Sequence, residues 1–250
     1  MSGHSKWSSI KHKKGAADAK RGKLFSKLSR AIIVAAREGG PDPAGNLALQ
    51  NAIEKARTYS MPKDNIERAI AKGSGADSEG SNFETVVYEG YGPEGVAVLV
   101  EALTDNRNRT ASEVRHLFTK NGGNLGTTGA VAWQFERRGV VLVSGDADED
   151  EVLLVAAEAG AEDIEADGAS FVVSTPPETL VPVREALEAA GFGVESAELS
   201  MVPKGTVAIA DESTARRVVR LIEGLEDADD VQDVYANFDI PETVLEAVAS

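Results

Sequence analysis

The stretch ETVVYEGYGPEGVAVLVEAL, residues 84–103, marks the point at which a helical pattern gives way to a strand pattern. Thr85–Glu89 and Val96–Leu103 are rich in β-branched and apolar residues, and the turn residues Gly90–Gly95 separate them. We therefore expect two strands joined as a hairpin. The turn has the spacing G-x-G-x-x-G, but a dinucleotide site needs a helix after the last glycine, and a strand pattern follows here.

The chain before this hairpin predicts a small helical bundle. Apolar residues recur at three- and four-residue spacings over Leu24–Ala35 and again over Leu47–Tyr59. A third helix is expected to open within Met61–Glu67, where Asp64 and Glu67 have the spacing of a capping box. Three short helices with polar outer faces fit one small bundle.

Residues 104–136 predict one more helix and one more strand. Thr110 and Glu113 also have capping-box spacing, so a helix is expected to start at Thr110. Asn121–Gly129 contains four glycines. It is interpreted either as a mobile contact loop or as a connection that needs positive φ angles. Ala130–Glu136 has the pattern of a strand.

Residues 139–201 form a self-contained β-α-β-β-α-β pattern of ferredoxin-like type. The expected elements are Val140–Ser144, Asp148–Ala159, Asp163–Glu165, Phe171–Ser174, a helix that ends at Gly191, and Val194–Met201. Pro182 falls inside the second helix of this pattern and is expected to kink it, because proline lacks a backbone N–H.

A strand, the helix Ser213–Leu225 and the strand Val231–Phe238 remain after residue 205. Three elements are few for a separate domain, so we expect them to complete the sheet begun by residues 84–136. The sequence thus predicts an α+β multidomain protein with an N-terminal three-helix domain, residues 1–76, and two α+β domains of ferredoxin-like type. One comprises residues 77–137 together with 206–250, and the other, residues 138–205, is an acidic domain inserted in it.

Charge is distributed unevenly along the chain. The formal net charge is −15, yet residues 1–75 contain 15 Lys and Arg against 6 Asp and Glu. Residues 139–250 contain 5 Lys and Arg against 26 Asp and Glu. An acidic chain that concentrates positive charge at one end is suited to hold a polyanion there, and the phosphates of that polyanion repel its acidic part. Nucleic acid is the polyanion that we expect.

Positive charge is densest in the first thirty residues, where nine Lys and Arg accompany one acidic residue, Asp18. Such cations neutralise phosphates and release counterions, and an aromatic ring among them can stack on an exposed base. The alternative is a solvated tail with its tryptophan packed on the bundle. The candidate nucleic-acid-binding residues here are Lys6, Trp7, Lys11, His12, Lys13, Lys14, Lys20, Arg21, Lys23, Lys27 and Arg30.

A second candidate cluster, Thr104–Thr110, lies between a predicted strand and a predicted helix. Arg107 and Arg109 in this cluster could grip phosphate through their forked guanidinium donors, beside the free N–H groups of a helix start. A polar loop that serves only to cap the helix is an equally open alternative.

Other classes of function find little support in the sequence. The chain has no Cys, which excludes disulfides and thiolate metal sites and fits a reducing compartment. The three histidines show no ligand spacing, and Asp146–Asp150 departs from a calcium loop at its glycine and its twelfth position. We expect no cofactor, no metal and no catalysis. No apolar run approaches the roughly 20 residues of a membrane span, so we expect a cytoplasmic protein that does not bind membranes.

Five segments carry a family resemblance. They are GHSKW at 3–7 with KHKK at 11–14, MPKDNIERAI at 61–70, YEGYGP at 88–93, DNRNRT at 105–110 and GGNLG at 122–126. In these segments the chain resembles the YebC family. The resemblance extends over essentially the whole chain and is densest over residues 1–138, whereas the acidic insertion resembles the family in pattern more than in identity.

This resemblance implies a cytoplasmic protein with a helical N-terminal domain and two α+β domains. The family is described as transcriptional regulators that bind DNA. Some members are implicated in translation on ribosomes instead, and mitochondrial relatives activate the synthesis of particular proteins. No cofactor or catalytic residue comes with the resemblance. The resemblance implies a nucleic-acid-binding role for the basic residues of the N-terminal motif and also for Arg107 and Arg109.

Three functions stay open from the sequence. The first is a non-enzymatic, nucleic-acid-binding regulator of transcription that binds DNA. The second is a ribosome-associated translation factor that contacts ribosomal or transfer RNA, and a basic arm with Trp7 and His12 suits irregular RNA. The third is a protein-interaction scaffold with a nonspecific basic tail. The expected partners are nucleic acid and, for the second function, the ribosome, and we expect a monomer.

Overall fold

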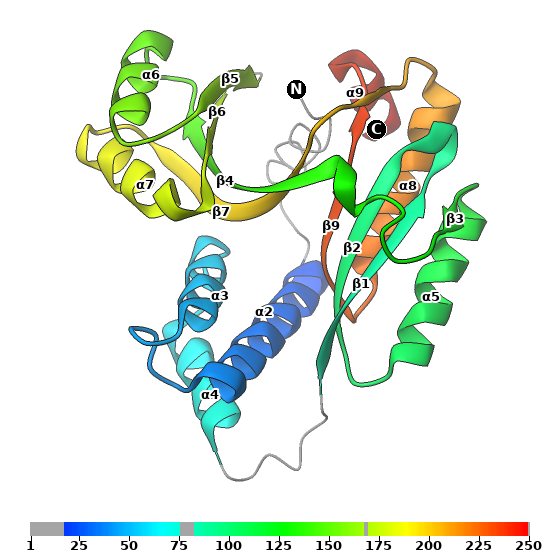
Figure 1. Cartoon of the computed structure of the whole chain (residues 1–250), viewed down its shortest axis with the longest axis horizontal. Helices are drawn as coiled ribbons and strands as arrows, with labels where there is room; N and C mark the ends of the chain where they lie inside the picture. Colours follow the sequence, from blue (N-terminus) through cyan, green and yellow to red (C-terminus); the bar gives the residue numbers. More distant parts are fainter. Residues whose placement is uncertain (1–17, 76–82, 168–169, 250) are drawn as a thin grey trace.

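The computed structural model describes residues 18–75, 83–167 and 170–249. The described chain forms three parts in sequence order: a bundle of three helices and two antiparallel sheets, each packed against helices (Figure 1). The protein therefore has a mixed α+β multidomain fold, as the sequence predicts.

The helical bundle consists of α2 (Asp18–Gly39), α3 (Leu47–Thr58) and α4 (Lys63–Ser74). Both short helices pack against α2, and the shared core includes Leu28, Ile32, Leu49, Ile53 and Ile66. The buried side chain of Asn46 holds the turn between α2 and α3. Its oxygen accepts a hydrogen bond from the N–H of Leu49 at 3.0 Å as the N-cap of α3. Its nitrogen donates to the carbonyl oxygens of Ala35 and Gly40, at 2.7 and 2.8 Å.

The first sheet has the antiparallel strand order β3-β1-β2-β9. Its strands are β1 (Glu84–Tyr91), β2 (Ala97–Thr104), β3 (Asn124–Leu125) and β9 (Val231–Ala236). β1 and β2 form the predicted hairpin, with the 3-10 turn η1 (Pro93–Gly95) between them. β9 comes from the far end of the chain and pairs with β2, so segments on both sides of the second sheet share the first one.

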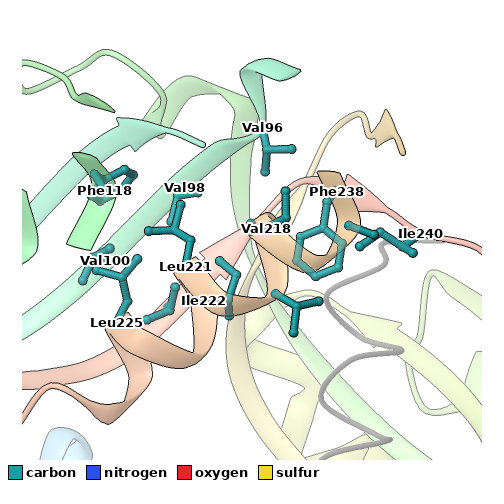
Figure 2. Packing of buried hydrophobic residues seen from close by; sticks show 14 of the residues in the cluster. Val96, Val98, Val100, Phe118, Val218, Leu221, Ile222, Leu225, Phe238 and Ile240 are labelled. Atoms are coloured by element: carbon teal, nitrogen blue, oxygen red, sulfur yellow. The ribbon is translucent and has the colours of Figure 1, made fainter. Parts of the chain in front are cut away.

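One face of this sheet is covered by α5 (Arg107–Lys120) and α8 (Glu212–Asp227), and α9 (Glu242–Ala249) packs on α8. A short parallel pair, β8 (Val207–Ala208) and β10 (Phe238–Asp239), lies beside them. Figure 2 shows the core between sheet and helices, in which Val98 of β2 meets Leu221 and Ile222 of α8. Buried residues recur along α8 at three- and four-residue spacings, so one apolar stripe faces the sheet and the other side of the helix carries charge.

The second sheet has the order β5-β6-β4-β7. Its elements are β4 (Phe135–Ser144), α6 (Glu149–Glu158), β5 (Asp163–Asp167), β6 (Ser170–Thr175), the 3-10 turn η3 (Pro177–Thr179), α7 (Leu180–Ala189) and β7 (Val194–Pro203). This β-α-β-β-α-β order, with the first and third strands in the centre, is the predicted ferredoxin-like arrangement. The first sheet is also antiparallel, but it begins with a hairpin and so has a different chain order.

The two predicted capping boxes are wrong. α5 begins at Arg107, and its N-cap is Asn106, whose side-chain oxygen accepts from the N–H of Arg109 at 3.1 Å. Thr110 lies buried inside the helix instead, and its hydroxyl donates to the carboxylate of Asp230. α4 begins at Lys63, and its N-cap position is Pro62, which has no side chain able to cap the helix.

Residues 121–136 agree with the prediction only in part. Gly122 and Gly129 have φ angles of 80° and 86°, which confirms a connection that needs positive φ angles. Asn124–Leu125 pair with β1 as an edge strand, and a Cβ on Gly123 would lie 2.5 Å from the carbonyl oxygen of Tyr91. This close approach to β1 explains the glycine better than a mobile loop does. The strand predicted for Ala130–Glu136 is wrong over most of its length, because Ala132–Gln134 is a 3-10 turn, η2, and β4 starts only at Phe135.

The expected kink at Pro182 is absent from α7 because this helix begins at Leu180, directly after η3. Pro182 therefore lies in the first turn of α7. N–H groups in a first turn have no partner within the helix, so a proline there removes no hydrogen bond.

The buried carboxylate of Glu89, in β1, directs the chain from the first sheet to the second. It accepts hydrogen bonds from the N–H groups of Gly129 at 2.6 Å and of Val131 and Ala132 at 2.7 Å each. Burial by itself raises the pKa of Glu89, but these three backbone donors outweigh it and hold the pKa below its ordinary value. The segment thus has a partner for its N–H groups without forming a strand.

We predict that Glu89→Gln destabilises the protein by about 2–3 kcal/mol at pH 7, because the amide NH₂ would face buried backbone donors. Urea unfolding measures this change. Glu113→Gln, an exposed change on α5, is the control and should stay within about 0.5 kcal/mol. The pKa of Glu89 is lower in the folded chain, so its contribution exists above the ordinary value of 4.5 and fades as pH falls through the folded value. Equal stabilities of Glu89→Gln and wild type at pH 7 would contradict the prediction.

Candidate nucleic-acid interface

The residues predicted to bind nucleic acid fall into three groups. Lys6, Trp7, Lys11, His12, Lys13 and Lys14 lie outside the described residues. Lys20 and Arg21 lie near the start of α2, and their side chains are not described. The side chains of Lys23, Lys27, Arg30, Arg107 and Arg109 are described.

The two lysines of α2 contact the C-terminal end of α8. The Nζ atom of Lys27 donates to the carbonyl oxygen of Glu226 at 2.6 Å. The Nζ atom of Lys23 lies 3.5 Å from the carbonyl oxygen of Asp227 and 3.7 Å from the carboxylate of Asp229. The last turn of a helix has carbonyls without intrahelical partners and the negative end of the helix dipole. The bundle therefore supplies cations that cap a helix in another part of the fold.

Arg30 continues this contact toward the interior. Its Nη1 atom lies 3.1 Å from the carboxylate of Asp230, 3.1 Å from the carbonyl oxygen of Asp229 and 3.3 Å from that of Leu103. Its guanidinium also lies over the ring of Phe83, 4.9 Å from the ring centre, which adds a cation–π contact. The side chain of Arg30 is 23% exposed, against 59% for Lys23.

Arg109 shares the same carboxylate. Its Nη2 atom donates to Oδ2 of Asp230 at 2.7 Å, and the hydroxyl of Thr110 donates to this oxygen at 2.7 Å. The Asp230 side chain is 6% exposed. Burial alone raises the pKa of this carboxyl, but the hydrogen bonds from Arg109 and Thr110 and the charge of Arg30 bring the pKa below its ordinary value. Asp230 thus joins α2, the start of α5 and the segment that leads into β9.

Arg107 has a different neighbour. Its Nη1 atom lies 3.9 Å from the carboxylate of Glu84, and its side chain is 65% exposed. An ion pair of this exposure and length contributes little to stability. Arg107 and Lys23 therefore remain accessible to an outside phosphate, whereas the Nη1 atom of Arg30 is engaged by acceptors within the chain.

Two more ion pairs hold the helical bundle against the sheets. Lys55 of α3 pairs with Asp233 of β9, and Arg184 of α7 lies 3.6 Å from Glu54 of α3. The bundle thus contacts both α+β parts through charged groups. Its position depends on charge complementarity rather than on a shared apolar core.

The sequence analysis missed two features. Asp230 lies in a run of acidic residues without any motif, and only tertiary contacts reveal its role. The second feature is a group of arginines on α8, in a segment whose net charge is strongly negative: Arg216, Arg217 and Arg220. Their spacing was the available signal, because three of the five basic residues in 139–250 lie within five positions.

Neither a metal site nor a membrane segment emerges from residues 18–75, 83–167 and 170–249. Within these ranges no three His, Asp or Glu side chains gather as ligands. The helices found there are either too short or too polar to cross a bilayer.

A three-helix bundle followed by two α+β parts, joined through charged contacts, defines a class of three-domain protein, and sequence comparison gives its family. Residues 5–76 match the family described as "TACO1/YebC protein N-terminal domain", and residues 83–238 match "TACO1/YebC second and third domain". The chain belongs to the TACO1/YebC family.

Similar proteins span nearly the whole chain. A Rubrobacter xylanophilus protein named "Probable transcriptional regulatory protein" is 61% identical over 250 residues and covers 100% of both chains. A Halothermothrix orenii protein of the same name is 54% identical and covers 99% of both. The crystal structure of a conserved hypothetical protein from Aquifex aeolicus superposes with a TM-score of 0.80 at 54% identity, over 90% of this chain and 93% of that one.

We predict that Asp230→Asn destabilises the protein by about 2–3 kcal/mol, because the amide NH₂ would face donors such as Arg30 and Thr110 at a buried position that needs an acceptor. Thermal and urea unfolding measure the loss. Asp229→Asn is the matched control: its side chain is 76% exposed and lies 3.7 Å from Lys23, so the change should be below about 0.5 kcal/mol. Similar losses of stability in the two variants would show that the buried Asp230 contributes no more to folding than the exposed Asp229.

Proposed function

We propose that this protein is a non-enzymatic regulator of transcription that binds DNA through its N-terminal basic segment and helical bundle. The observation that carries the proposal is the charge asymmetry of the chain. Residues 1–75 hold 15 Lys and Arg against 6 Asp and Glu, in a chain whose net charge is −15. Phosphate attracts the first part and repels the rest, so the charge favours binding in one orientation.

The relatives support the regulatory part of this proposal, because the Rubrobacter and Halothermothrix proteins both carry the name of a transcriptional regulator. The contacts of α2 support a division of labour among the predicted residues. Arg30 and Lys27 bind acceptors within the chain, so their main task is to position the bundle. We assign the phosphate contacts chiefly to the lysines that precede α2, with Lys23 and Arg107 as exposed additions.

Such an interface would provide affinity more than sequence specificity. Lysine ammonium groups act as point charges on the phosphate backbone, and base edges are read by side chains that enter a groove. The exposed side of α4 carries charges of both signs, including Lys63, Asp64, Glu67 and Arg68.

We propose that the protein acts as a cytoplasmic monomer.

The triple change Lys11→Glu, Lys13→Glu and Lys14→Glu should weaken binding to a fluorescent 20-base-pair DNA at least 10-fold. Each lost phosphate contact reduces the salt-dependence slope of log K by about 0.9. Fluorescence anisotropy between 50 and 200 mM salt (about the range in which such slopes are measured) gives both quantities. The control is Arg115→Glu, Arg137→Glu and Lys204→Glu, at three exposed positions outside the helical bundle. Equal loss in both triple variants would refute the assignment of the site.

Crosslinking in cells, followed by sequencing of the bound nucleic acid, tests the nature of the target. We expect enrichment of chromosomal DNA at promoters. Recovery of ribosomal or transfer RNA instead would replace this proposal with a translation factor, and recovery of neither would favour a protein scaffold.

A further inference from the structure

A group of arginines on α8 belongs to no contact described so far. Arg216, Arg217 and Arg220 lie on the solvent side of this helix, opposite the stripe that packs on the sheet. Together with Glu212 and Ser213 they line an open depression. Figure 1 shows α8 beside α5 on the covered face of the first sheet. We call this group the α8 arginine patch.

The requirements of the fold do not explain the patch. The three arginines lie in the N-terminal half of α8, while Glu223, Glu226 and Asp227 lie in its C-terminal half. A helix dipole favours the reverse order of charge. The acidic C-terminal half has a partner, because Lys23 and Lys27 of α2 contact that end. At the basic N-terminal half the acidic side chains are Asp211 and Glu212, which belong to the start of the same helix.

Local contacts account for only part of the patch. Arg216 pairs with Glu212 one turn earlier, and such a pair stabilises a helix slightly. Arg217 donates to the hydroxyl of Thr214 at 3.1 Å, which orients its guanidinium, and its charge also acts on the carboxylate of Asp211. Within the described chain, no hydrogen bond or ion pair is recorded for the side chain of Arg220. Arg220 and, in part, Arg217 therefore remain available to an outside anion at this end of α8.

The patch continues onto α5. The Nη1 atom of Arg217 lies 3.5 Å from the position that a Cβ on Gly122 would occupy, just after the end of α5. The exposed Lys120 lies in the last turn of α5. The residues from 217 to 227 span about 15 Å along α8, at 1.5 Å per residue. The patch is thus roughly this distance from the end of α8 that the exposed Lys23 of α2 contacts.

We propose that the α8 arginine patch is a second contact surface for the phosphodiester backbone of a nucleic acid, an inference that rests on the proposed function. Guanidinium groups bind phosphate through two parallel N–H donors, and Arg217 is already held in place for this by Thr214. A protein partner fits less well, because the depression is lined only by charged and hydroxyl side chains, and protein interfaces depend on apolar or aromatic anchors.

The test uses the full-length double variant Arg217→Gln/Arg220→Gln, which leaves the Glu212–Arg216 pair intact. Its matched control is Arg137→Gln/Lys204→Gln, which removes the same charge from two exposed positions outside both α8 and the helical bundle. The probes are a fluorescent 20-base-pair DNA and a fluorescent 20-nucleotide single-stranded RNA, measured separately by anisotropy. Circular-dichroism melting of each variant checks that the fold is retained.

We expect the patch variant to bind at least 10-fold more weakly to the nucleic acid that the wild type prefers. Its salt-dependence slope should fall by about 1.4 to 1.8, the value for two lost phosphate contacts. The control variant should change less than two-fold. Equal effects of the two variants, or no effect of either, would refute the inference that the α8 arginine patch contacts phosphate. The proposed function would not be affected by that result. If the wild type bound neither probe, the proposed function would fail and the patch with it.

Discussion

The carboxylate of Asp230 is the contact that joins the helical bundle to the first sheet and its helix α5. It accepts from Arg30 of the helical bundle and from Arg109 and Thr110 of α5, directly before β9 joins the first sheet. A buried carboxylate is stable only when it is paired and hydrogen-bonded, so each of these donors is needed. One ionised group therefore links the orientation of α2, the start of α5 and the register of β9.

The uneven charge of the chain also helps to hold the helical bundle in place. Lys23 and Lys27 contact the C-terminal end of α8, where the dipole and the acidic side chains are both negative. A net-positive bundle and a strongly acidic remainder attract each other as well as outside ligands. The cations of the first thirty residues thus serve two tasks. Those nearest α8 position the bundle, and those further toward the N-terminus are left for the polyanion in our proposal.

How far the sequence predicts the structure depends on how local each determinant is. The β1–β2 hairpin, α8 and the order of strands in the second sheet follow from periodicity and turn residues, and all three were predicted. The predicted start of α5 was wrong because both Asn106 and Thr110 have side chains that can cap a helix. Asn106 is the cap, and the hydroxyl of Thr110 donates to the distant Asp230 instead. The segment 130–134 carries a strand pattern, yet Glu89 takes up its N–H groups from another strand.

By itself the sequence determined the α+β class, the separation into a basic and an acidic part, and the identity of most helices and strands, because these properties depend on composition and on neighbours within one or two turns. Only the tertiary structure decided which cations are engaged inside the molecule and which stay exposed. In the sequence, Arg30 and Arg217 are both arginines within helical patterns, and nothing local distinguishes them. One meets a buried carboxylate and the other an open surface, because long-range packing alone determines which groups become neighbours.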